Sequence, residues 1–234
     1  SKEEWKPDGK YIKRLCFMGI PMGLQYSVTA IGTLVLQTAI NGMGASGVAG
    51  VTAAQKINAF IASPVEALGQ TMAPYAGQNM GAGKADRIGK GLWQACLAGF
   101  CASAVCFLLA LVAGKQLVLL FLDAGETTII SYAYRFLLYC TGAYCLLTLV
   151  NVVRFTIQGM GFSVFAIIAG VMEMIARILV AVVVAGHFGF TGICLAHPAA
   201  WVFADAFLIP AFFYCKRRMQ KEQGNVTLST NFTS

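Results

Sequence analysis

The sequence predicts an all-α integral membrane protein with six transmembrane helices. Of the 234 residues, 58% are hydrophobic and only 12% are charged, whereas soluble domains carry about a quarter charged residues. The mean hydropathy is +0.70, so the chain has too little polar surface to cover a soluble globule. Its apolar residues also gather into runs long enough for membrane helices, which need about 20 mostly apolar residues.

The six runs are separated by short polar segments. They cover residues 15–40, 51–76, 92–121, 131–157, 163–186 and 191–215. We expect residues 1–14 to form a cytoplasmic loop, residues 15–215 the six-helix domain, and residues 216–234 a cytoplasmic tail. Several runs contain proline, which membrane helices tolerate because neighbouring groups satisfy the freed backbone.

The cations indicate the orientation. With a cytoplasmic N-terminus, thirteen lie on the inner side and three on the outer side. The inner set is Lys2, Lys6, Lys10, Lys13, Arg14, Lys84, Arg87, Lys90, Arg154, Lys216, Arg217, Arg218 and Lys221, and the outer set is Lys56, Lys115 and Arg135. The positive-inside rule therefore places both termini of a multi-pass inner (plasma) membrane protein in the cytoplasm. This orientation accounts for the net charge of +7, so we expect no nucleic-acid partner.

The chain lacks the usual signatures of an enzyme or a metal protein. None of its eight cysteines belongs to a CxxC pair, so we interpret them as small buried hydrophobic residues. There is no Ser-His-Asp set and no HExxH motif. We expect no catalysis, no metal and no cofactor.

Uncharged polar residues mark the first two runs. Gln25, Thr29 and Thr33 recur four residues apart, and Gln37 continues them by another turn, so one stripe of the first helix is polar. We favour the wall of a substrate cavity for this stripe, together with Asn58 of the second run. The alternative is hydrogen bonding between helices.

Two acids lie deep in the predicted spans, Glu66 in the second and Asp205 in the sixth. Neither has a basic residue within a helical turn, and desolvation disfavours an unpaired carboxylate. Each is therefore a candidate to bind a proton or a cation, and Glu66 also to bind a substrate amine. The alternative is a protonated or hydrogen-bonded acid at a helix contact, which we favour for Asp205 because it lies near a predicted kink at Pro210.

Glu173 and Arg177 interrupt the otherwise apolar fifth run. If this span begins near Phe162, Glu173 is about 16 Å deep, close to the middle of the bilayer. A lone charge there is costly, but residues four apart share a helix face and can pair. We favour an ion pair that fixes helix packing, and the alternative is a gating relay whose pairing changes with the transport state.

Five stretches in order resemble one known family. They are "GIPMGLQYSVTAIGTLVLQTAINGMG", "APYAGQNMGAGKADR", "TIQGMGFS", "EMIAR" and "HPAAWVFAD". Together they are similar to the multidrug and toxic compound extrusion (MATE) transporters, and most similar to bacterial members of the DinF-like branch. The similarity extends from about Tyr11 to Arg218.

The resemblance implies a twelve-helix transporter built from two six-helix lobes, related as parallel repeats are. This chain resembles the C-terminal lobe, helices seven to twelve, and "SKEEWKPDGK" resembles the end of the central cytoplasmic loop. Its partners would then be the bilayer, small organic cations, and the missing N-terminal lobe or a second copy. The implied function is export of cationic or amphipathic drugs in exchange for H⁺ or Na⁺.

The chain also departs from the family pattern. Some members carry cation-site acids on helices seven and ten, but residues 15–40 and 131–157 contain none, so that site is not carried over. Glu173 and Arg177 match a Glu-x-x-x-Arg pattern associated with helix eleven. Two alternatives remain. One is a flippase for lipids or lipid-linked oligosaccharides, although Arg177 is the only deep cation expected. The other is a non-transporting membrane fragment.

Overall fold

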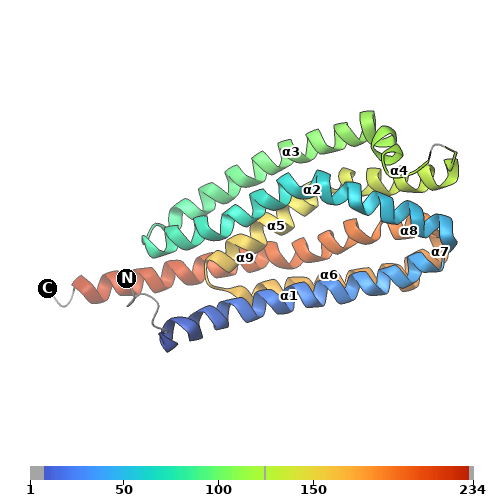
Figure 1. Cartoon of the computed structure of the whole chain (residues 1–234). Coiled ribbons are helices and arrows are strands. Elements are labelled where there is room, and N and C mark those ends of the chain that lie inside the picture. Colours follow the sequence, from blue (N-terminus) through green and yellow to red (C-terminus); the bar gives the residue numbers. More distant parts are fainter. Residues whose placement is uncertain (1–7, 124, 232–234) are drawn as a thin grey trace.

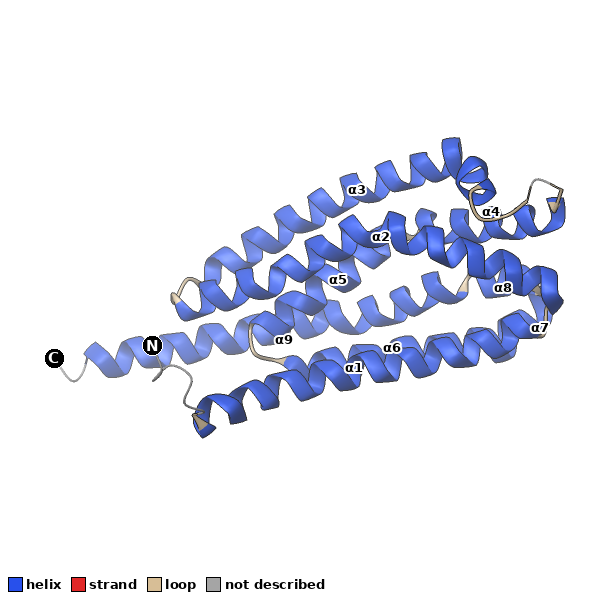
Figure 2. Ribbon diagram, in the orientation of Figure 1, coloured by secondary structure: helices blue, strands red, loops and turns tan. Residues whose placement is uncertain are grey.

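The computed structural model describes residues 8–123 and 125–231, and every regular element in this part of the chain is a helix (Figure 1, Figure 2). The long helices run antiparallel, side by side, as a bundle. The elements are α1 (Gly9–Asn41), α2 (Gly44–Gly81), α3 (Ala85–Leu119), α4 (Thr127–Gly142), α5 (Tyr144–Gly159), α6 (Ser163–Leu179), the π-helical η1 (Val180–Val184), α7 (Ala185–Phe188), α8 (Phe190–Cys194) and α9 (Ala196–Asn231).

Each of the six apolar runs forms one helical pass. The fourth run is divided into α4 and α5, which are bent by 50° relative to each other. By length and hydropathy, four passes qualify as membrane spans: α1, α3, the continuous segment Ser163–Phe188, and α9 over Ala196–Gln220. The bent pair α4–α5 forms a fifth. The remaining pass, α2, is 38 residues long and contains several polar residues.

The two ends of the bundle differ in charge. The start of α1, the α2–α3 and α5–α6 turns and the end of α9 lie at one end (Figure 1), which we call the terminal end. The opposite, far end holds the α1–α2 and α3–α4 turns. Lys2 and Lys6 lie outside the described residues, and the other cations of the two sets follow this division as expected, except for Arg154. The prediction that Arg154 lies in an inner loop is wrong, because α5 continues to Gly159 and Arg154 is buried within it.

Left-handed glycines make two of the tight turns at the terminal end. Gly83 has φ 68° and Gly161 has φ 90°, a conformation that costs glycine little and other residues more. The N-terminus of α1 has a side-chain cap, in which the Asp8 carboxylate accepts a hydrogen bond of 2.8 Å from the backbone N–H of Lys10. The helix therefore begins before the apolar run that predicted it.

Helix α5 forms the centre of the lobe. It packs against α2, α3, α6 and α9, and all of residues 151–158 are buried. By contrast, α1 packs mainly against α6, and α3 lies on the outside of α2, α4 and α5. Any charged side chain on the buried stretch of α5 therefore needs a partner inside the protein.

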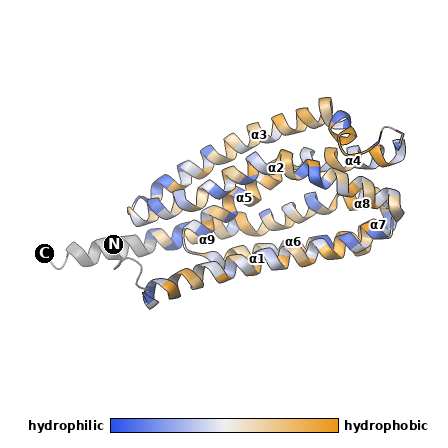
Figure 3. Cartoon of the chain, in the orientation of Figure 1, coloured by the Kyte–Doolittle hydropathy of each residue, from blue (hydrophilic) through white to orange (hydrophobic). Residues whose placement is uncertain are grey.

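Several passes expose large apolar side chains, α1 among them. Those of α3, α6 and α9 are Trp93, Leu97, Val105, Leu108, Leu109, Leu111, Val112, Leu119, Val164, Ile175, Leu179, Val202, Phe203, Ile209, Phe213 and Tyr214. The far half of α3 is almost wholly apolar (Figure 3). In a membrane protein such faces lie against lipid, because the bilayer core solvates apolar groups and not polar ones.

Glycines allow α2 and α5 to approach closely. A Cβ atom added to Gly69 would lie 2.6 Å from Cβ of Asn151, and one added to Gly159 would lie 2.3 Å from the carbonyl oxygen of Ala73. Both distances are far below a normal carbon or oxygen contact. Small residues commonly permit such backbone contact between membrane helices.

We predict that Gly69→Ala destabilises the lobe by about 1–3 kcal/mol, as overpacking of a close contact does. The matched control is Gly77→Ala on the same helix, where the new Cβ would lie 3.5 Å from the nearest atom, the carbonyl oxygen of Gly159. The control should be neutral or slightly stabilising, because alanine favours helix more than glycine does. Thermal unfolding in detergent measures both, and equal transition temperatures would contradict the close contact.

Candidate functional site

A buried ion-pair cluster lies where α5 and α6 meet. The Glu173 carboxylate accepts from two arginines: its Oε2 binds Nη2 of Arg177 at 2.9 Å, and its Oε1 binds Nη2 of Arg154. Arg177 is one turn along α6, whereas Arg154 comes from α5. The exposed fractions are 7% for Arg154, 3% for Glu173 and 4% for Arg177. One carboxylate thus joins the central helix of the lobe to its neighbour.

Sequence reasoning missed the role of Arg154. It lies near the end of an apolar run, where a loop seemed to begin. The signal that could have located it is the stretch after it, because the helix continues to Gly159 and the left-handed glycine comes only at Gly161. Arg154 therefore lies on the buried stretch of α5 and not in a loop.

Asp205 of α9 adds a fourth charged residue. It is 5% exposed, and neither of its carboxylate oxygens has a hydrogen-bond partner among the described residues. It interacts electrostatically with Arg154 and Glu173, and with Cys96 of α3. We call Arg154, Glu173, Arg177 and Asp205 the charge cluster. The two positive charges of its guanidinium groups are balanced by the negative charges of its two carboxyl groups only when Asp205 is ionised.

The charge cluster has unused hydrogen-bonding capacity. Nε of Arg154 and both Nε and Nη1 of Arg177 are buried without a partner in the described part of the chain. Buried unsatisfied donors cost free energy, and partly satisfied polar networks contribute less to stability than complete ones. These donors are therefore available for a further hydrogen-bond partner within the cluster.

The polar residues predicted on α1 are divided by the structure. Gln25 is buried, and its Oε1 accepts a hydrogen bond of 2.6 Å from Nε2 of Gln158 on α5. Thr29 lies beside it against Gly170 of α6, with a buried hydroxyl that has no partner among the described residues. Gln25 therefore makes a bond between helices, which was the alternative to a cavity wall.

The other predicted residues of α1 bond along their own helix. The Thr33 hydroxyl donates to the carbonyl oxygen of Thr29 at 3.2 Å, and Nε2 of Gln37 donates to Oδ1 of Asn41 at 3.0 Å. These two side chains are partly buried and contact no other helix through the bonds they make. Both side chains remain partly accessible on the surface of α1.

Asn58 fixes α2 to the start of α5. The hydroxyl of Tyr144 donates to the side-chain Oδ1 of Asn58 at 2.8 Å and to the main-chain carbonyl oxygen of Asn58 at 3.1 Å. Tyr144 is fully buried and follows the break between α4 and α5. The bond holds α2 beside this break, so Asn58 has a structural partner within the lobe.

Helix α2 exposes a polar face. Its members are exposed and lie three, four, seven or eight residues apart, as positions on one helix face do: Thr52, Lys56, Ser63, Glu66, Gln70 and Gln78. We call them the α2 polar face. Glu66 lies near the middle of the helix. Phe60, which is 85% exposed, lies among the residues of this face. The α2 polar face nevertheless differs from the exposed faces of α3, α6 and α9 in its charged and amide groups, which are unsuited to contact with lipid.

Within the residues that the structure describes, no group of three or more His, Cys, Asp or Glu residues is placed to hold a metal ion. His197 packs its ring edge-on to Phe136 and tilted against Trp201, as a residue of the core does. The polar groups that remain for function are the charge cluster and the α2 polar face.

Comparison with known proteins gives consistent results. Residues 21–183 match the protein family described as MatE. The chain is 24% identical to the "Probable multidrug resistance protein YoeA" of Bacillus subtilis (strain 168) over 223 residues, 89% of this chain and 45% of that protein. It is 32% identical over 85 residues to "Probable multidrug resistance protein YpnP" of the same organism, 36% of this chain and 18% of that protein.

Solved structures share the fold. The Vibrio cholerae MATE transporter VcmN in its bent form superposes with a TM-score of 0.80 at 16% identity, covering 91% of this chain and 48% of that one. A MOP superfamily transporter from Pyrococcus furiosus gives a TM-score of 0.77 at 18% identity, covering 84% and 43%. The chain thus spans about half or less of the relatives that it matches.

We predict that Glu173→Gln destabilises the protein by about 3–5 kcal/mol, because it leaves two buried arginines without their shared counter-charge. Arg177→Met should cost clearly less, since Glu173 keeps Arg154 as its partner. Denaturant unfolding of the purified protein in detergent compares the two variants. A larger loss for Arg177→Met than for Glu173→Gln would show that Glu173 does not hold the cluster together.

Proposed function

Because this chain belongs to the MatE family, we propose that it forms one lobe, helices seven to twelve, of a secondary active transporter that exports small organic cations and amphipathic drugs. The support is a match to about half of each structural relative and to relatives named for multidrug resistance. The partner would be an N-terminal lobe or a second copy.

The α2 polar face is the observation that carries this proposal. Exposed polar side chains in the middle of a membrane helix are costly against lipid and mark substrate or ion pathways. A second lobe placed against α2 would enclose them in an aqueous cavity. The predicted cavity residues Thr33 and Gln37 of α1 would contribute to it, whereas Gln25 and Asn58 would support it through their interhelical bonds.

The charge of the α2 polar face favours a cationic substrate. Glu66 lies near the centre of this face. The cation of the face, Lys56, lies ten residues from Glu66, nearer the far end. A flippase cavity for phosphate-bearing lipids would need free cations, but Arg154 and Arg177 are both bonded to Glu173. A carboxylate beside the substrate instead attracts an amine or quaternary ammonium group.

Export of the substrate is coupled to entry of an ion if Glu66 binds either the substrate or the coupling ion, H⁺ or Na⁺. A ligand moves a two-state equilibrium only through different affinities for the two states. A carboxylate that exchanges substrate for an entering ion supplies such a difference between outward and inward access. The terminal end would face the cytoplasm, as the positive-inside rule predicts, so that ions enter from the far end.

Asp205 is the second candidate for proton binding. Protonation of Asp205 would leave the charge cluster with one excess positive charge, shared by Arg154 and Arg177. The resulting repulsion acts between α5 and α6, with α9 carrying the acid. Glu173 and Arg177 would then serve as gating residues, because the unpartnered donors of the arginines would allow them to change partners.

We predict that Glu66→Gln flattens the pH dependence of export, since the amide does not titrate in this range and carries no negative charge to attract a cation. The measurement is efflux of a fluorescent cation from proteoliposomes between pH 6 and pH 8, at matched protein content, with the complete transporter. The expected result is a loss of most of the pH response, with folding retained because Glu66 is exposed.

The matched control is Asp86→Asn, which removes an exposed acid at the start of α3 and should leave the pH response intact. An unchanged pH response in Glu66→Gln would sink the role of Glu66. If Asp205→Asn alone removes the response, coupling occurs in the charge cluster and not in the cavity.

A further inference from the structure

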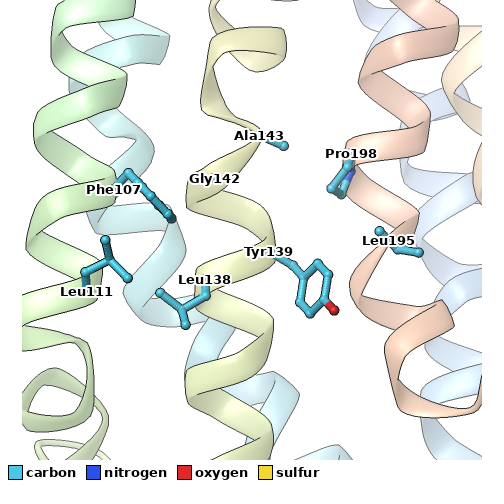
Figure 4. Close-up of a pocket in the computed structure, with 8 residues that line it drawn as sticks. All are labelled: Phe107, Leu111, Leu138, Tyr139, Gly142, Ala143, Leu195 and Pro198. Atoms are coloured by element: carbon cyan, nitrogen blue, oxygen red, sulfur yellow. The ribbon is translucent and has the colours of Figure 1, made fainter.

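A groove on the outside of the lobe has no part in the transport proposal. It has a volume of about 490 Å³ and lies between α3, α4 and the start of α9, with the α4–α5 break at its floor (Figure 4). Its lining is Phe107, Leu111, Leu138, Tyr139, Gly142, Ala143, Leu195 and Pro198. The side chains are apolar apart from the Tyr139 hydroxyl, so the groove is suited to a hydrocarbon chain.

Two cations lie at the far-end mouth of this groove. Lys115 is one helical turn beyond Leu111 on α3, and Arg135 is one turn before Tyr139 on α4. Residues four apart share a helix face, and α3 and α4 run in opposite directions. Both cations are therefore displaced about 6 Å from the lining residues toward the same end of the bundle.

Contacts hold the two cations on either side of α4. The Lys115 ammonium lies 5.5 Å from the centre of the Tyr134 ring. The Arg135 guanidinium lies 5.9 Å from the centre of the Phe190 ring and donates to the Thr191 hydroxyl at 3.0 Å. Within the described part of the chain neither forms an ion pair with a carboxylate, and both are exposed.

We propose that this groove binds an anionic phospholipid of the surrounding bilayer. One acyl chain lies against Leu111, Leu138 and Gly142, and the headgroup phosphate lies between Lys115 and Arg135. Lysine and arginine near the membrane surface attract anionic headgroups, and long cationic side chains reach toward the headgroup layer.

The dimensions agree with this placement. Arg135 and Gly142 are seven residues apart on α4, about 10 Å along the helix. One leaflet of the hydrocarbon core is about 15 Å thick, so an acyl chain anchored at Arg135 extends past the whole lining. Exposed Leu108 and Val112 on α3 and Val202 on α9 belong to the apolar faces of the two helices that flank the groove.

Native mass spectrometry of the complete transporter tests this site. Phosphatidylglycerol and phosphatidylcholine of equal chain length are titrated into the same detergent. The wild-type protein should retain one phosphatidylglycerol more strongly than any phosphatidylcholine. Lys115→Gln and Arg135→Gln should each weaken that retention about fivefold, and the double variant about 30-fold, if each cation contributes as cations near membranes do.

Two matched controls separate the site from general charge effects. Lys56→Gln removes a cation from the same half of the bundle on α2 and should retain the lipid. Gly142→Leu fills the groove while both cations remain, so this variant should lose the bound lipid. Gly142→Ala adds a Cβ that would lie 3.4 Å from the Phe107 ring, an ordinary contact, so this variant should keep the bound lipid. Equal retention of the two lipids, or equal loss in Lys56→Gln, would overturn the proposal.

Discussion

The lobe depends on one carboxylate that is shared by two arginines. Glu173 joins α5 to α6 through Arg154 and Arg177, and α9 brings Asp205 to the same cluster. In a bilayer no water is available at this depth to replace a missing partner, so the three helices are held by the balance of charge as well as by packing. The same dependence would make the cluster sensitive to protonation of Asp205, which is the basis of the gating role that we propose for it.

The second constraint is the contrast between exposed faces. Apolar side chains cover the outside of α3, α6 and α9, whereas α2 exposes Lys56, Ser63 and Glu66 along one face. A helix of this composition is stable in a membrane only when another element of the protein shields it from lipid. The chain spans about half of its structural relatives, and the missing half would supply that shield.

Much of the fold could be predicted from the sequence, because apolar runs of membrane length show directly in hydropathy. All six runs form helical passes. The site was harder to predict, because the periodicity within one helix does not show which neighbouring helix a side chain contacts. Glu173 and Arg177 are four residues apart and were found together, but Arg154 pairs across helices from a position that resembled a loop. Gln25 similarly faces Gln158, 133 residues away in sequence.

Cysteine accessibility of α2 tests the central claim most directly, namely that its polar face lines an aqueous cavity. Ser63→Cys and Gln70→Cys are compared with Leu109→Cys and Val112→Cys on α3, in a complete transporter whose native cysteines, including the eight of this chain, are replaced. A water-soluble maleimide is added to both sides of the membrane. The account predicts labelling of the α2 positions, slowed by a transported cation, and none on α3. Unlabelled α2 positions, or labelling that is equal on both helices, would contradict it.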